Sequence, residues 1–306
     1  MRAGVPGTPG RLSPGERGRA GSAGSGAPRR LAPYATKMPS RRVDAPVLIT
    51  GAGSGLGLRL AELLGSRGHA VIALDLQFGD EARNRLTAAT VGQVRFEGVD
   101  VRDGAAVVEA VARGVQALGA PSLAINCAGV QDAARFEDLS EESFRRVIDI
   151  NLIGSRNVAA AVLPHLTRGG HLVLIASMAG LVANYGYAAY GASKYGVVGL
   201  GQVLRIEQRP RGVTVSVVCP PEVETPMVDE ERRTMLPATK ALKDMAGTLE
   251  LEPAVREILR GIDRRRPMIV PGGAAKRTLL LTRFLPRWAV NLVTDRIVRK
   301  ALRASE

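Results

Sequence analysis

The chain has 306 residues, 45% hydrophobic and 23% charged, and a formal net charge of +13 at pH 7. The basic excess belongs to the ends. Residues 1–46 contain nine Lys/Arg and two acidic residues, and residues 264–306 contain eleven and two. The middle, with 22 basic and 25 acidic residues, is mildly acidic. Basic ends can attract nucleic acid or anionic lipid. Neither a zinc pattern nor an RNA-binding signature accompanies them, so we expect no nucleic-acid partner.

Residues 1–44 are rich in Gly, Pro and Arg and lack hydrophobic periodicity, which predicts a disordered extension. The apolar core of a secretory signal is missing from it. Two interpretations stay open. An Arg-rich, acid-poor leader resembles a transit peptide, but six prolines and eight glycines in residues 1–40 discourage the amphipathic helix that such a leader needs. The alternative, which we favour, is that translation begins at Met38.

The first ordered pattern begins with the apolar run Val47–Thr50. A glycine-rich turn, Gly51-Ala-Gly-Ser-Gly-Leu-Gly57, follows it, and then a helical pattern and a second apolar strand at Ala70–Leu74 that ends on Asp75. This is the order of a dinucleotide-binding βαβ unit. The glycines let the backbone approach a pyrophosphate at the helix N-terminus. Asp75 lies where a carboxylate accepts hydrogen bonds from both adenosine ribose hydroxyls, and it would repel a 2′-phosphate.

Apolar strands and helical segments continue to alternate, which predicts an α/β fold with a single doubly wound Rossmann domain and a parallel sheet. Further strands are expected at Val94–Val99, Ser122–Asn126, His171–Ala176, Val213–Val218 and Met268–Val270. Helices are expected at Gly104–Leu118, Glu141–Thr167, Ala188–Gln208 and Pro253–Ile262. The catalytic domain should span residues 45–273, with a lid at about 225–252. Ligands of such sheets bind beyond the C-terminal strand ends, and Gly51, Asp75, Asp100, Asn126, Ser177 and Pro220 each follow a predicted strand.

A tyrosine and a lysine four residues apart, Tyr190 and Lys194, share one face of a predicted helix, with Ser177 thirteen residues before the tyrosine. Free tyrosine has a pKa of about 10 and is a poor base at neutral pH. An ammonium beside it favours the phenolate and brings the phenol toward acid–base chemistry. The serine hydroxyl can hold the oxygen whose proton is moved.

Six motifs occur in the order typical of the short-chain dehydrogenase/reductase family, and the chain resembles that family over roughly residues 45–270. They are Thr50-Gly-x-x-x-Gly-x-Gly57, Asn126-Cys-Ala-Gly129, Asn151, Ser177, Tyr190-x-x-x-Lys194 and Pro220-x-x-Val-x-Thr225. The resemblance implies that Tyr190 is the acid–base residue, that Ser177 holds the substrate oxygen, that Lys194 binds the nicotinamide ribose and that Asn151 supports a water relay. It also implies cofactor contacts by Gly51, Ser54, Gly55, Leu56, Gly57, Asp75, Asp100, Val101, Asn126, Ala128, Gly129, Tyr190, Lys194, Pro220, Val223 and Thr225.

The chain departs from the family pattern after the strand at Val213–Val218, where Pro220-Pro221 stands in place of Pro-Gly. Proline has a fixed φ and no N–H, so we expect a stiffer loop there. The Pro-Pro-acid loop, the Met268–Gly272 segment and the basic, apolar tail resemble the 3-ketosphinganine reductase branch of the family. That branch generally uses NADPH and acts on lipid ketones at membranes. Because Asp75 repels a 2′-phosphate, we expect NAD(H) here rather than NADP(H).

Residues 274–306 predict an amphipathic, basic helical tail. Its apolar surface comes from Leu279–Leu281, Phe284, Leu285, Trp288–Val293, Ile297 and Val298. Its polar stripe comes from residues four apart, namely Arg287, Asn291, Asp295, Arg299 and Arg303. The run is too short to span a bilayer. Two interpretations stay open: binding to an anionic membrane surface, or packing on the body or a second subunit. We expect a cytoplasmic protein, with peripheral membrane association as the first of these alternatives implies, and a homodimer or homotetramer.

Neither the two cysteines nor the three histidines have metal-ligand spacing, so no metal site is expected, and both thiols should be buried and inert. The expected reaction is reversible hydride transfer between NAD(H) and a secondary alcohol or ketone. Apolar lid residues such as Met235, Leu242 and Met245 favour a hydrophobic, lipid-like substrate. The alternatives are an NADPH-dependent lipid ketone reductase and a non-catalytic, NAD(H)-binding scaffold at membranes.

Overall fold

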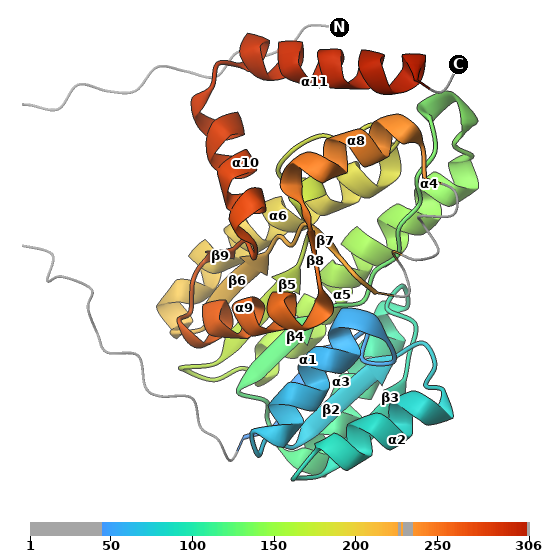
Figure 1. The fold of residues 1–306 in the computed structure, drawn as a ribbon. Helices are drawn as coiled ribbons and strands as arrows, with labels where there is room; N and C mark the ends of the chain where they lie inside the picture. Colours follow the sequence, from blue (N-terminus) through green and yellow to red (C-terminus); the bar gives the residue numbers. More distant parts are fainter. Residues whose placement is uncertain (1–44, 226–227, 229–234, 305–306) are drawn as a thin grey trace, which may run out of the picture. The chain divides into compact units, whose positions relative to one another are not determined.

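Seven parallel strands form one sheet in the computed structural model, which describes residues 45–225, 228 and 235–304. The strand order is β3-β2-β1-β4-β5-β6-β9 (Figure 1). The strands are β1 (Val47–Thr50), β2 (Val71–Asp75), β3 (Val94–Gly98), β4 (Leu123–Asn126), β5 (His171–Ile175), β6 (Thr214–Val218) and β9 (Met268–Ile269). The doubly wound Rossmann fold is thus confirmed, and each predicted strand end is shifted by at most one residue. The predicted extension at residues 1–44 lies outside the described residues.

Helices cover both faces of this sheet. The side chains of α3 (Gly104–Leu118), α5 (Gly154–Val162) and α6 (Ala188–Gln208) pack into one buried apolar cluster. Those of α1 (Gly55–Ser66), α2 (Asp80–Ala89) and α9 (Leu251–Asp263) pack into a second. Burial on both faces explains why the strands read as continuous apolar runs in the sequence. The strand order reverses between β1 and β4, so the crevice beyond their C-terminal ends is the ligand-binding position of such sheets.

The single helix predicted over Glu141–Thr167 is wrong in its middle and at its end. An α-helix, α4, covers Glu141–Ile148, and a π-helical segment follows at Asp149–Ile153 before α5 begins. A short 3₁₀ segment, Leu163–His165, ends the run. The wider π turn places Asn151 in the interior, where its side chain is fully buried, and such segments are frequent at functional sites.

The lid and tail form a separate group of helices next to the sheet. Two short parallel strands, β7 (Glu222–Val223) and β8 (Thr248–Leu249), flank α8 (Pro237–Ala246). After β9, the tail forms α10 (Gly273–Phe284) and α11 (Arg287–Arg303), separated at Leu285 and Pro286. Figure 1 shows α11 lying across α8, and both tail helices pack on α8. The tail therefore packs on the body of the protein, one of the two interpretations left open by the sequence. Among the described helices, none is long and apolar enough to cross a membrane.

Candidate active site

The glycine turn after β1 is built for a close backbone approach. Gly51 has φ +66°, and a Cβ placed on it would lie 2.8 Å from the backbone nitrogen of Ala128. A Cβ on Gly57 would lie 2.0 Å from the carbonyl oxygen of Gly51. No other residue fits these two positions, so the N-terminus of α1 stays open for an anion. This cradle has the shape that a dinucleotide requires.

Asp75 ends β2 beside the turn and holds it. The Asp75 carboxylate accepts a hydrogen bond from the backbone N–H of Gly53 at 2.7 Å. It also accepts one from the N–H of Gln77 at 3.4 Å. The acid is thus fixed at the turn, partly exposed, in the position that the sequence predicts for a ribose contact.

Asn126 and Thr50 join the ends of β4 and β1 beneath the turn. The Thr50 hydroxyl donates to Asn126 Oδ1 at 2.7 Å and accepts from the N–H groups of Cys127 and Ala128 at 3.1 and 3.2 Å. The Asn126 amide donates to the Ser155 hydroxyl at 2.8 Å. Asn126 is only 1% exposed and does not line the cavity. Asn126 thus holds the Thr50 hydroxyl, which in turn holds the backbone of Cys127 and Ala128.

Asp100 and Val101 follow β3, next to the end of β2. The Asp100 carboxylate forms a bidentate ion pair with Arg102, at 2.9 and 2.6 Å to Nε and Nη2. The Arg102 guanidinium holds the pKa of that carboxyl below its usual range. The carbonyl oxygen of Val101 accepts from the Asn157 amide at 3.0 Å. These contacts fix the edge of the crevice beyond Asp75.

Ser177, Tyr190 and Lys194, which are separated in sequence, line one cavity of about 370 Å³. The Ser177 Oγ accepts a hydrogen bond from the N–H of Ala179 at 3.1 Å. The ring of Tyr190 meets the ring of Tyr187 edge to face, with centroids 5.2 Å apart. The Lys194 ammonium lies 5.6 Å from the centroid of the Tyr190 ring and donates to the carbonyl oxygen of Ile175 at 3.1 Å.

Lys194 is 5% exposed, and burial lowers its pKa to about 8. Desolvation is the main cause, because a charge loses its hydration in the interior. At neutral pH the group is still mostly protonated, and its cation stands beside the phenol. Both neighbouring thiols stay neutral: burial raises the pKa of Cys127 and of Cys219 to about 12.

Asn151 holds the backbone that faces Lys194. Its amide donates to the carbonyl oxygen of Val130 at 2.9 Å and to the Ser193 hydroxyl at 3.0 Å, and its Oδ1 accepts the Val130 N–H at 2.8 Å. A Cβ on Gly129 would lie 3.1 Å from Asn151 Oδ1 and 3.4 Å from Lys194 Nζ. Asn151, Gly129 and Lys194 are therefore direct neighbours, although Asn151 does not line the cavity itself.

The loop after β6 closes the cavity between the glycine turn and the lid. The carbonyl oxygen of Pro220 accepts the N–H of Met178, 2.8 Å, which ties this loop to Ser177. The side chain of Thr225 lies 3.5 Å from a Cβ placed on Gly55. Of the sequence-predicted positions, the cavity is lined by Gly51, Ser54, Gly55, Leu56, Gly57, Ala128, Gly129, Ser177, Tyr190, Lys194, Pro220, Val223 and Thr225.

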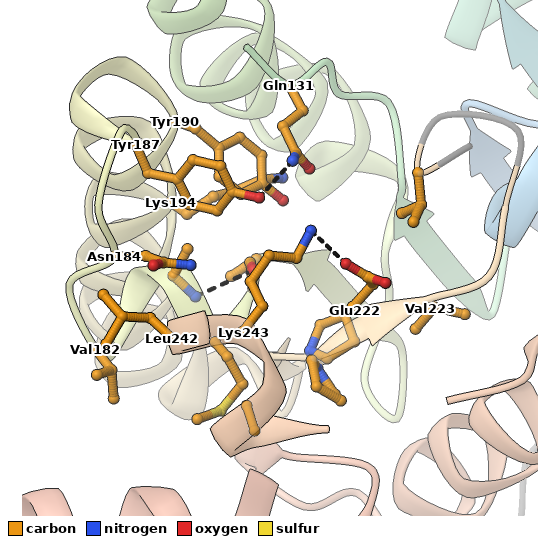
Figure 2. A pocket seen from close by; sticks show the side chains of 18 of the residues that line it. Gln131, Val182, Asn184, Tyr187, Tyr190, Lys194, Glu222, Val223, Leu242 and Lys243 are labelled. Atoms are coloured by element: carbon orange, nitrogen blue, oxygen red, sulfur yellow. Dashed lines mark hydrogen bonds and ion pairs between the residues drawn. The ribbon is translucent and has the colours of Figure 1, made fainter. Parts of the chain in front are cut away.

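The far end of the cavity is mostly apolar. Part of it comes from the lid, whose residues Leu242 and Met245 were expected to favour a hydrophobic substrate, and part from the tail, which the site prediction did not include. This end is lined by Leu242 and Met245 of α8, Leu281 and Leu285 of α10 and its C-cap, and Val290 and Val293 of α11. Polar side chains line the same cavity. Figure 2 shows Gln131 donating to the Tyr187 hydroxyl, at 2.6 Å, and Lys243 paired with Glu222. Gln131 and Glu222 lie in or next to quoted motifs, but those motifs assign them no role, and Lys243 has no fixed spacing to any of them.

Comparison with known proteins agrees with this geometry. A family model described as short chain dehydrogenase matches residues 45–236. The chain belongs to the short-chain dehydrogenase/reductase family. Oxidoreductase UcpA of Salmonella typhimurium is 36% identical over 214 residues, which cover 67% of this chain and 80% of that protein. A 3-ketodihydrosphingosine reductase of Bos taurus is 30% identical over 239 residues, covering 75% and 72%.

A solved short-chain dehydrogenase of Mycobacterium paratuberculosis, bound to NAD, has the same fold with a TM-score of 0.68. It is 26% identical, and the match covers 76% of this chain and 98% of that one. As a member of the short-chain dehydrogenase/reductase family, the chain is an oxidoreductase that acts on hydroxyl and keto groups. The resemblance to the lipid-ketone reductase branch, stated from the sequence, is confirmed at about 30% identity.

Proposed function

We propose that this enzyme interconverts a hydrophobic secondary alcohol and its ketone by hydride transfer with NAD(H). The observation that carries the proposal is the single cavity in which the glycine turn, Ser177, Tyr190 and Lys194 meet. When bound, the cofactor supplies or accepts the hydride at its nicotinamide ring. The residues of this chain hold the substrate oxygen and move its proton.

Each role follows from position and charge. The Ser177 and Tyr190 hydroxyls hold the substrate oxygen, and Tyr190 gives up or takes the proton. The buried Lys194 cation, beside the phenol, stabilises the phenolate form. Asn151, through its bonds to Val130 and Ser193, keeps this group of residues in place.

A preference for NAD(H) over NADP(H) rests on Asp75. Its carboxylate is fixed at the turn by the Gly53 N–H, where it can accept hydrogen bonds from ribose hydroxyls. A 2′-phosphate at that position would meet a like charge at short range, which costs binding free energy. The NAD bound to the Mycobacterium paratuberculosis relative supports the same choice. We also propose that the other predicted cofactor contacts, from Ser54 to Thr225, bind NAD(H).

The apolar far end of the cavity favours a long, hydrophobic substrate. Six apolar side chains from α8, α10, α11 and the α10–α11 link line it. Thr278, Thr282 and Thr294 line it as well, and their hydroxyls donate to backbone carbonyl oxygens. A pocket of this kind gains affinity with every methylene that it buries. Similarity to a 3-ketodihydrosphingosine reductase supports a long-chain ketone or alcohol.

The tail helices also offer a surface for an anionic membrane. Leu280, Phe284, Trp288 and Leu292 are 53, 78, 71 and 57% exposed, and we call these four residues the outer apolar face. Residues 273–303 contain eight Lys/Arg and one acidic residue. Exposed apolar side chains among cations are typical of helices that bind the bilayer interface. Assembly into a homodimer or homotetramer is part of the same proposal.

Replacement of the proposed acid–base residue tests the reaction. Tyr190→Phe should lower turnover by at least about 10²–10⁴-fold, the usual worth of general acid–base assistance, and leave NADH binding intact. The assay is oxidation of NADH, compared with NADPH, with ketones of rising chain length. Tyr195→Phe is the matched control, because Tyr195 is on the same helix, half exposed and outside the cavity. Retained turnover in Tyr190→Phe would reject the mechanism, and faster oxidation of NADPH would reject the cofactor preference.

A further inference from the structure

Two charged side chains face each other inside the cavity. Lys243 comes from α8 and Glu222 from β7, just after Pro220 and Pro221, and they form an ion pair between Nζ and Oε2. Their side chains are only 12% and 6% exposed. The second carboxylate oxygen of Glu222 accepts a hydrogen bond from the Thr248 hydroxyl at 3.2 Å.

Stability does not account for this pair. Removing two charges from water costs more than their attraction returns in many proteins, and an apolar pair of similar volume is often neutral or stabilising. The two segments are also joined without the charges. The backbone N–H of Glu224 donates to the carbonyl oxygen of Leu249 at 3.0 Å, and β7 pairs with β8. Both side chains line the cavity, so the pair is placed where it can contact a bound substrate.

The pair is close to the reacting groups. The Lys243 ammonium is 5.8 Å from the centroid of the Tyr187 ring, and that ring is the one that meets Tyr190. Figure 2 shows the Lys243 and Glu222 side chains pointing toward each other, with Tyr187 and Gln131 nearby. Leu242, next to Lys243 on α8, lines the apolar part of the cavity. The pair thus lines the same cavity as the reacting hydroxyls and the apolar side chains of α8.

We propose that Lys243 and Glu222 form a specificity site for a hydroxyl group on the substrate, a few carbons from the reacting carbonyl. The proposal rests on the proposed function and names its substrate class: a long-chain hydroxyketone or the matching diol. A hydroxyl can donate to the Glu222 carboxylate and accept from the Lys243 ammonium at the same time. A charged substituent would be attracted by one member of the pair and repelled by the other, and it would lose its hydration without a net opposite charge to balance it, so the pair favours a neutral group.

The test compares a straight-chain ketone with isomers that carry a hydroxyl one, two or three carbons from the carbonyl. For the best isomer, wild-type kcat/KM should exceed that of the plain ketone by about 10- to 100-fold, the usual worth of hydrogen bonds to charged groups. The double variant Lys243→Met/Glu222→Leu should lose this ratio, which compares two substrates of the same protein and does not depend on the overall activity of the variant. The exchange variant Lys243→Glu/Glu222→Lys, which preserves a donor and an acceptor, should regain much of the ratio.

Lys240→Met is the matched control, since Lys240 is an exposed lysine on the same helix and does not line the cavity. Thermal unfolding of each variant checks that α8 is still folded, and the exchange variant gives a second reading if the apolar one is unstable. A wild type without preference for any hydroxylated isomer would overturn the proposal. So would a ratio that survives in the double variant.

Calorimetric dissociation constants for the same ketones, with NADH present, separate this proposal from the proposed reaction. If wild type binds the hydroxylated ketone more tightly than the plain ketone, and the double variant does not, the specificity site is supported even when no turnover is seen. Absence of turnover would then count against hydride transfer alone. Equal binding of both ketones by wild type would reject the pair, whatever the turnover.

Discussion

Lys194 lowers the stability of the folded protein, although its position serves the candidate active site. Its ammonium is buried beneath Tyr190, and burial lowers its pKa to about 8. In the unfolded chain a lysine titrates near 10.4. Below pH 8 the folded protein therefore carries a charge that would be better solvated in the unfolded chain, and this charge costs stability.

The sign of the pH dependence follows from proton counting. Between pH 8 and about 10.4 the unfolded chain holds a proton on this lysine that the folded protein has released. The destabilisation by Lys194 is thus complete below pH 8 and disappears as the pH rises toward 10.4. Lys194→Met should be more stable than wild type by up to about 3 kcal/mol at pH 7, and this difference should shrink toward pH 10.

Urea unfolding of the two proteins at pH 7 and pH 10 measures this difference. Lys276→Met, on the tail, is the control for a partly exposed lysine in an ion pair with Glu257. Activity of Lys194→Met should be lost even though its stability rises, a trade-off typical of active sites. A wild type that is the more stable protein at pH 7 would show that the bond to the carbonyl oxygen of Ile175 outweighs desolvation.

Residues with a fixed spacing could be predicted from sequence, and residues without one could not. Tyr190 and Lys194 are four apart on a helix, and Asp75 ends an apolar strand, so local rules locate them. Glu222 lies within the motif Pro220-x-x-Val-x-Thr225, but its ion pair with Lys243 of α8 joins two segments that no local rule brings together. A charged residue in a lid reads as a solvated one, and only the packing of α8 shows otherwise.

At the scale of elements, contacts between helices and strands determine where a helix predicted from hydrophobic periodicity changes its geometry. The helix predicted over Glu141–Thr167 has continuous helical character in sequence, but it changes to a π turn at Asp149–Ile153. Gly154, at the start of α5, packs so closely on Val101 that a Cβ would lie 2.7 Å from Val101 Cγ2. A contact between α5 and the end of β3 is invisible in a local pattern.

The tail helices are a wall of the cavity and not only an appendage. Leu281 lines the cavity, whereas its neighbour Leu280 does not, and the two side chains are 57% and 53% exposed. A tryptophan at each of these two positions therefore compares a change inside the cavity with the same change on the outer surface. Leu281→Trp should narrow the apolar end, and Leu280→Trp should change only the outer surface.

We expect wild-type kcat/KM to rise about four-fold for each methylene added to the substrate, since each buried methylene contributes about 0.8 kcal/mol. In Leu281→Trp this rise should stop at a shorter chain length, with short ketones unaffected. Steady-state kinetics over a series of chain lengths measures it. If Leu280→Trp shortens the preferred chain as well, or neither variant does, the substrate does not extend between α10 and α8.

At the scale of the whole molecule, charge and apolar surface are distributed unequally. The catalytic middle of the sequence is mildly acidic, and both ends are basic. Within the described part of the chain, the outer apolar face lies on the same two helices as eight of the basic residues. Part of the apolar surface predicted for the tail packs on α8, as Val290 and Ile297 are partly buried, and part of it stays exposed.

The outer apolar face and the basic residues around it predict that the protein binds vesicles that contain anionic lipid. The double variant Phe284→Ser/Trp288→Ser removes the two most exposed side chains of the outer apolar face and touches neither the cavity nor the charge. Full-length wild type should float with anionic vesicles in a density gradient, less so at high salt because screening weakens attraction to the lipid. The variant should float at least about ten-fold less, given the apolar area that it withholds from the bilayer.

The comparison of these two full-length proteins also separates the tail from the basic N-terminal extension. Residues 1–46 are identical in both, so any binding by that extension contributes equally, and only the outer apolar face differs. Turnover of a short, soluble ketone should be equal in the two proteins, because neither residue lines the cavity. Equal flotation would assign vesicle binding to the basic residues alone. Loss of flotation together with a change from dimer to monomer in size-exclusion chromatography would instead assign the face to a second copy of the chain.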